Sequence, residues 1–179
     1  MIAPAVPSPD DKDWTWVLER PCPECGFDAS TLLRTELAAL VQRSAASFRA
    51  ALAADNAAQR PAPDVWSPLE YGCHVRDVCT RFGERLALML AEDDPQFANW
   101  DQDETALADR YWTQQPAVVS EELTDAASAI ATAFASVPGG AWDRPGRRSN
   151  GSVFTVDTLG RYFAHDLVHH AHDIGRPIH

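Results

Sequence analysis

Apolar side chains recur at steps of three and four residues in four stretches of the chain, a spacing that places them on one face of a helix. The first stretch starts at Ser30, the second at Ser67, the third after Pro116, and the fourth runs from about Thr155 to Ile174. No stretch shows a convincing strand pattern. We therefore predict an all-α protein, built as a four-helix bundle.

Turn residues separate these helices. The segment RPAPDVW interrupts the first two, and SPLE then forms a capping box in which Ser67 and Glu70 bond each other's backbone N–H groups. Pro138-Gly139-Gly140 ends the third helix. The polar and aromatic segment 94–115 is only weakly periodic, which predicts a long, partly helical connection between helices two and three.

The length of 179 residues fits one domain. We divide the chain into an N-terminal arm with a CPECG turn, residues 1–29, and the bundle, residues 30–179. The first fourteen residues, rich in proline, aspartate and alanine, are expected to be disordered or draped over the domain, with Trp14 and Trp16 anchoring their end.

The charge narrows the range of partners. With 26 acidic against 15 basic residues the net charge is -11, which argues against nucleic acid and against anionic membranes. A charged leader is missing, as is any run of roughly 20 apolar residues. We expect a cytoplasmic protein that acts on a small molecule. Lys12 is the only lysine, while arginine and alanine abound, which suggests a bacterial origin.

The segment RYFAHDLVHHAHDIG carries four of the six histidines. His165 and His169, one helical turn apart and about 40° apart around the axis, can both reach one ion. His74, at the margin of the apolar face of the second helix, is the candidate third ligand. Three imidazoles with water in the fourth position form an open, catalytic type of metal site. The alternative is a helix in which this spacing is coincidental.

Neighbouring residues have further roles in this prediction. Asp77, Asp166 or Asp173 could fix a histidine tautomer by accepting the second ring N–H. His170 projects toward the apolar face and is expected to be packed, whereas His172 continues the metal face and could contact a substrate.

An all-helical chain with a histidine in YGCHVRD and a pair in HDLVHHAHD resembles the DinB-like superfamily over roughly residues 30 to 175. That superfamily includes mycothiol-dependent maleylpyruvate isomerases and bacillithiol transferases. The resemblance implies that His74, His165 and His169 bind a divalent ion, commonly zinc or nickel. It also implies a homodimer. In the isomerases the first ligand of the last helix is glutamate; here it is His165, which departs from the isomerase pattern.

The resemblance further implies a metal-bound, low-molecular-weight thiol such as mycothiol, whose sulfur attacks an electrophilic small molecule. The chain is then a metal-dependent, thiol-dependent S-transferase; the alternative is a non-catalytic bundle that binds a metal or ligand. Two groups of residues are candidates for contacts with substrate or cofactor. The basic loop could bind a carboxylate, or could be a solvated turn, and Tyr111 could line the pocket or pack. The candidates are Arg144, Arg147, Arg148, Tyr111 and His172.

CPECG raises a second metal question, because Cys22 and Cys25 have the spacing of half a zinc site. Cys73 and Cys79 on the second helix lie about 120° apart and are poor partners for one ion. A second metal site, a Cys22–Cys25 disulfide and a turn with reduced thiols all remain open.

Overall fold

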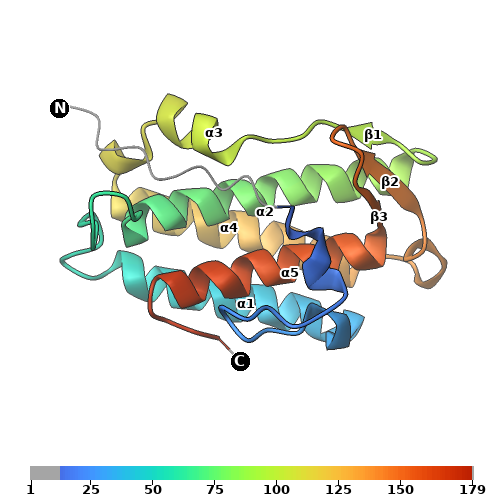
Figure 1. Cartoon of the computed structure of the whole chain (residues 1–179), viewed down its shortest axis with the longest axis horizontal. Helices are drawn as coiled ribbons and strands as arrows, with labels where there is room; N and C mark the ends of the chain where they lie inside the picture. The colour runs from blue at the N-terminus through green and yellow to red at the C-terminus, as the bar shows by residue number, and fades with distance from the viewer. Residues whose placement is uncertain (1–12, 179) are drawn as a thin grey trace.

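Four long helices pack side by side in the computed structural model, which describes residues 13–178 (Figure 1). The predicted all-α four-helix bundle is therefore confirmed. The predictions for residues 1–12 and for His179 lie outside the described residues. The four helices are α1 (Arg34–Leu52), α2 (Pro68–Ala91), α4 (Pro116–Ala135) and α5 (Val156–Asp173).

The predicted apolar faces meet in one core. Val41 and Phe48 of α1, Val78 of α2, Leu123 of α4 and Phe163 of α5 have no exposed surface. Each such side chain contributes about 1.5 to 3 kcal/mol by leaving water.

Gly160 lets α5 approach α1 closely. A Cβ at this position would lie 2.8 Å from Leu37 Cδ2 and 3.2 Å from Phe134 Cε1. The packing that fixes α5 therefore depends on the absence of a side chain here.

The helix boundaries follow their capping signals, with one difference. Ser67 accepts from the backbone N–H of Glu70, and Thr155 caps α5 in the same way. Helix α1, expected from Ser30, begins at Arg34 instead. Asp28 caps a short 3₁₀ helix, η2 (Ala29–Thr31), and the extended Leu32 that follows separates it from α1.

The long connection between α2 and α4 is present as predicted and is partly helical. It contains β1 (Gln96–Phe97), the short helix α3 (Gln102–Ala108) and the 3₁₀ helix η3 (Tyr111–Thr113). In Figure 1 it runs along α2. Trp100 Nε1 donates to Thr105 Oγ1 at 2.7 Å, which holds the Trp100 indole in place beside the bundle.

A small sheet corrects the expectation that the chain has no strands. β2 (Pro145–Arg148) pairs parallel with β1 and antiparallel with β3 (Val153–Thr155), so that Gly146 faces Phe154. Gly151 turns the β2–β3 hairpin with a φ of +99°. Strands of two to four residues are too short to show the alternation by which a strand is recognised.

The N-terminal segment packs against α5. Its 3₁₀ helix η1 (Trp14–Leu18) and η2 both contact α5, and Val17, Cys22 and Ala29 are buried. Trp14 and Trp16 stack with ring centroids 5.6 Å apart. The part of this arm that the structure describes is therefore tightly bound to the bundle. Within residues 13–178, no helix is long and apolar enough to cross a membrane.

The start of α2 depends on a buried ion pair, which yields a stability prediction. Glu70, 1% exposed, accepts from Arg60 and from Ser67. Burial alone would raise its pKa, but Arg60 and Ser67 outweigh this and lower it. The pair therefore stabilises the fold above the ordinary pKa of glutamate and loses this effect as the pH falls below it.

Glu70→Gln is expected to lower the free energy of unfolding at neutral pH by about 3 kcal/mol, because Arg60 is left without its buried counter-charge. Urea denaturation would measure this. Glu84→Gln, which breaks the exposed pair with Arg81, should change stability by less than about 0.5 kcal/mol. Equal effects of the two substitutions would contradict this account.

Candidate metal centre

His74 lies at the centre of the site and is completely buried on α2. Trp100 stacks on its ring at 5.5 Å with an interplanar angle of 5°, and Trp66 packs against it at a centroid distance of 5.5 Å. The ring of His170 meets it edge-on at 4.6 Å. The His74 ring is therefore held in one orientation, facing α5.

Asp166 and His170 of α5 complete a group of three possible ligands. Asp166 Oδ1 lies 3.6 Å from His74 Nε2 and 3.5 Å from His170 Nε2. His74, Asp166 and His170 each offer one ligand atom, and these three atoms all lie within 4.8 Å of one another. Two ligand atoms bound tetrahedrally at about 2.1 Å from an ion would be about 3.4 Å apart. The spacing therefore fits a divalent cation.

Unsatisfied polar atoms also indicate an ion. Among the described residues, His74 Nδ1, His74 Nε2 and Asp166 Oδ1 are buried and have no hydrogen-bond partner. A buried polar atom without a partner is costly, and a cation would satisfy His74 Nε2 and Asp166 Oδ1 together.

The protonation states of His74 and Asp166 suit metal binding. Burial lowers the pKa of His74, so its imidazole is neutral at neutral pH. Burial opposes the ionisation of Asp166, but the neighbouring His170 and His74 outweigh it and lower its pKa to about 2. A neutral imidazole at His74 and an ionised carboxylate at Asp166 are the forms in which these two residues bind a cation.

Asp173 orients the third ligand. Its Oδ2 lies 2.9 Å from His170 Nδ1, which leaves Nε2 directed at Asp166. A carboxylate behind a ligating histidine is the usual arrangement at metal sites, because it fixes the tautomer and the ring. Of the three aspartates considered as such partners from the sequence, Asp173 has this contact, whereas Asp77 accepts from Tyr111 and Arg76.

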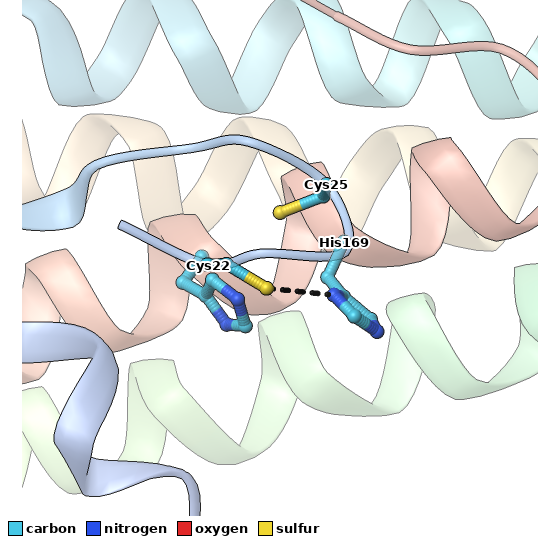
Figure 2. Close-up of side chains that lie close together, drawn as sticks. Cys22, Cys25 and His169 are labelled. Atoms are coloured by element: carbon cyan, nitrogen blue, oxygen red, sulfur yellow. Dashed lines mark hydrogen bonds between the residues drawn. The ribbon is translucent and has the colours of Figure 1, made fainter. Parts of the chain in front are cut away.

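A second group lies on the neighbouring face of α5. Cys22, Cys25, His165 and His169 also have ligand atoms within 4.8 Å of one another. Figure 2 shows Cys22 and Cys25 on the N-terminal segment beside His169, with Cys22 Sγ 3.7 Å from His169 Nδ1. All four cysteines of the chain carry free thiols.

Burial changes the pKa values in this second group as well. It raises the pKa of the Cys25 thiol to about 11. Burial, together with the neighbouring His169, lowers the pKa of His165 to about 4.

A pocket of about 600 Å³ opens over both groups. Its wall contains Asp166 and His170 of the first group and His165 and His169 of the second. Aromatic rings and polar acceptors form most of the remaining lining, and among its described residues Arg148 is the only lysine or arginine. The aromatic members are Trp14, Trp66, Tyr71, Trp100 and Tyr162.

The structure divides the predicted ligand set. His165 and His169 lie together as expected, but with Cys22 and Cys25, whereas His74 lies with Asp166 and His170. His74, His165 and His169 do not form a set whose ligand atoms all lie within 4.8 Å.

Sequence reasoning assigned Asp166 at most an orienting role and expected His170 to be packed. The sequence signal for Asp166 and His170 is the spacing D-x₃-H, which starts one residue after the H-x₃-H of His165 and His169.

The candidate substrate contacts also separate. Arg148 lines the pocket. Arg144 donates to the carbonyls of Met89 and Glu92, and Arg147 pairs with Asp94; neither lines the pocket.

The other two candidates lie away from the pocket as well. Tyr111 is fully buried and donates its hydroxyl to Asp77, and His172 is exposed.

Comparison with known proteins identifies the family. The sequence model of the DinB superfamily matches residues 37–174. The chain belongs to the DinB superfamily. No curated protein sequence matches it.

Two solved structures resemble this DinB-superfamily chain. One is YfiT from Bacillus subtilis, described as a probable metal-dependent hydrolase with an unusual four-helix bundle topology. The two structures superpose with a TM-score of 0.68 at 17% sequence identity, and the match covers 78% of this chain and 82% of YfiT. The other is a mycothiol-dependent maleylpyruvate isomerase, with a TM-score of 0.62 at 13% identity, covering 83% of this chain and 63% of the isomerase. At these identities the likeness shows a shared fold.

The contact between Asp173 and His170 leads to a prediction. Asp173→Asn should weaken divalent-cation binding by about 10-fold or more, because an amide neither fixes the His170 tautomer nor raises its basicity. Competition against a chromophoric chelator would measure the affinity. Asp143→Asn is the control: this carboxylate is exposed, with a side chain that is 92% accessible, and its loss should leave the affinity for the cation unchanged. An unchanged affinity in Asp173→Asn as well would show that the contact with His170 is incidental.

Proposed function

We propose that the protein is a metal-dependent enzyme that transfers a low-molecular-weight thiol of the mycothiol type to an electrophilic small molecule. The observation that carries this proposal is the convergence of His74, Asp166 and His170, of which Asp166 and His170 line an open pocket. Three protein ligands facing a cavity are typical of a catalytic site, since structural sites are closed by four. Zinc or nickel fits two imidazoles and a carboxylate.

The ligand set also bears on the reaction class. The resemblance implied glutamate as the first ligand of the last helix in the mycothiol-dependent isomerases, and His165 in that role departed from it. In the structure the carboxylate Asp166 faces His74, one turn before His170. A carboxylate at this place supports a thiol-dependent reaction.

A bound divalent cation lowers the pKa of a thiol or water that it coordinates and so supplies a nucleophile at neutral pH. In a conjugation, the thiol would lose its proton to solvent, its sulfur would form the new S–C bond, and a leaving group such as halide would depart with the electron pair of the broken bond. His74, Asp166 and His170 would hold the cation, and Asp173 would keep the proton on His170 Nδ1.

The lining of the pocket favours a thiol that is neutral and rich in hydroxyl groups. Asp64, Asp101 and Asp103 stand in the lining beside Asn99 and Gln102, and all of these offer oxygen acceptors for hydroxyl donors. The indoles of Trp14, Trp66 and Trp100 offer flat apolar surfaces beside them. A polyanionic thiol would be repelled by the carboxylates.

Arg148 is the residue that would bind an anionic group of the electrophile. Its Nε donates to Asn150 Oδ1 and its Nη2 to Ser152 Oγ, both at 2.9 Å. Its guanidinium lies 5.8 Å from the centroid of the Tyr162 ring. These contacts fix the charge at the edge of the pocket, where it can pair with a carboxylate.

The central test is thiol conjugation. With zinc or nickel present, the protein should consume an electrophile that carries a leaving group, such as a haloaromatic compound, only when mycothiol is added. His170→Ala and Asp166→Ala should each lower kcat/KM by about 100-fold or more, because each leaves the cation with two protein ligands. His172→Gln, an exposed histidine of the same helix, is the matched control and should retain activity.

The outcomes of this assay separate the alternatives. Turnover that proceeds equally well without any thiol would replace the proposal with a hydrolase. Binding of a cation without turnover of any substrate would favour the non-catalytic bundle.

Arg148 provides a separate prediction on specificity. Arg148→Gln should raise KM for an electrophile that carries a carboxylate by about 10-fold and leave a neutral electrophile unaffected, because a charge-assisted hydrogen bond contributes about 1.5 to 3 kcal/mol. Arg147→Gln, at the preceding residue of β2 but outside the pocket, is the control. Equal changes for charged and neutral electrophiles would show that Arg148 acts through the fold alone.

A further inference from the structure

The second group of ligands lies on the N-terminal segment and α5, outside the proposed catalytic set. We propose that Cys22, Cys25, His165 and His169 form a closed, tetrahedral zinc site that fastens the N-terminal segment to α5. This inference does not depend on the proposed function, because the two sites share no ligand.

The spacing within each pair is that of structural zinc sites. Cys22-x₂-Cys25 and His165-x₃-His169 fall within the ranges seen in sites with two cysteines and two histidines. Cys22 Sγ and His169 Nδ1 are 3.7 Å apart, and zinc at its usual distances from sulfur and nitrogen would separate them by about 3.6 Å. All four ligand atoms lie within 4.8 Å of one another, so small side-chain movements would complete the sphere.

The burial of the group supports an ion as well. Cys22 is 1% exposed, His165 4% and His169 8%. Among the described residues, His165 Nε2 is buried without a hydrogen-bond partner, which a metal would provide. Two thiolates would balance the charge of a divalent cation in this buried place.

Two carboxylates lie near the second ring nitrogen of His169. Glu24 Oε2, from the residue between the two cysteines, lies 3.6 Å from His169 Nε2, and Asp173 Oδ1 lies 3.9 Å from it. The nitrogen that faces Cys22 is the other one, Nδ1. His169 therefore directs Nδ1 toward the proposed ion and Nε2 toward the carboxylates, as ligating histidines commonly do.

The four ligand types indicate which metal would bind and whether the ion would be structural. Thiolates with imidazoles favour zinc over the oxygen-seeking magnesium and calcium. Four protein ligands close the coordination sphere, so the ion would be structural.

Its structural effect would reach the pocket through Trp14. The indole packs on His165 and His169 at centroid distances of 5.5 and 5.0 Å and also lines the pocket. Zinc at this site would therefore fix one wall of the neighbouring cavity.

The test must separate two adjacent sites, since His169 and His170 are consecutive and their ring centroids are 5.8 Å apart. Cobalt substitution does so, because a thiolate ligand gives Co²⁺ an intense charge-transfer band in the near ultraviolet and a nitrogen or oxygen ligand does not. The full chain, untagged and reduced, is stripped of metal and titrated with Co²⁺, and bound zinc is counted in parallel after reloading.

The band should appear in the unchanged protein and in a His74→Ala/His170→Ala variant. It should vanish in Cys22→Ala/Cys25→Ala, which should also bind one zinc ion fewer per chain. Cys73→Ala/Cys79→Ala, which removes two buried thiols of α2, is the matched control and should keep both the band and the ion.

A second readout does not require the cysteine variant to fold. In the unchanged protein, zinc should slow alkylation of Cys22 and Cys25 at least about 10-fold, as located by peptide mass analysis, and a chelator should reverse this. The proposal is overturned if Co²⁺ gives no thiolate band in the reduced protein, or if zinc leaves the reactivity of Cys22 and Cys25 unchanged. Failure of thiol-transfer activity would affect neither readout.

Discussion

Helix α5 carries two pairs of possible ligands, His165 with His169 and Asp166 with His170, and the second pair is displaced from the first by one residue. Each residue of a helix is rotated by about 100° from the one before it. His165 and His169 therefore face the N-terminal segment, whereas Asp166 and His170 face α2. Each pair keeps its members one turn apart, within reach of one ion. The separation of the two ligand groups depends on this offset, because it turns one pair toward α2 and the other toward the N-terminal segment.

This arrangement requires α5 to be held firmly between its neighbours. Gly160 lets it approach α1, and Phe163 and Leu167 anchor it in the core. The connection between α2 and α4 then places Trp100 on the outer face of His74. Burial of His74, Asp166 and His165 leaves polar atoms without partners among the described residues. Such burial is costly in a chain without ions and is offset when cations bind.

The fold was largely predictable from the sequence, because its signals are local. The capping box at Ser67, Pro116 and the periodic apolar positions mark the helices that the structure contains, and the DinB resemblance agrees with the family match. The short strands were missed because Gln96–Phe97 and its partners are too brief to show alternation. The late start of α1 was missed because Leu32 has no sequence feature that enforces its extended backbone.

The site was predictable only in part. The spacing of His165 and His169 shows that they share a face, but not which neighbour that face meets. The rotation of α5 decides this, and it follows from packing over the whole core. His74 was therefore paired with His165 and His169, when Asp166 and His170 lie nearer to it. The contact between Cys22 and His169 spans 147 positions along the chain, and nothing local in the sequence indicates it.

The most direct test of two separate sites is a crystal structure of the zinc-loaded protein with anomalous scattering recorded at the zinc edge. Our account predicts two peaks, one among His74, Asp166 and His170 and the other among Cys22, Cys25, His165 and His169. A single peak among His74, His165 and His169 would contradict it.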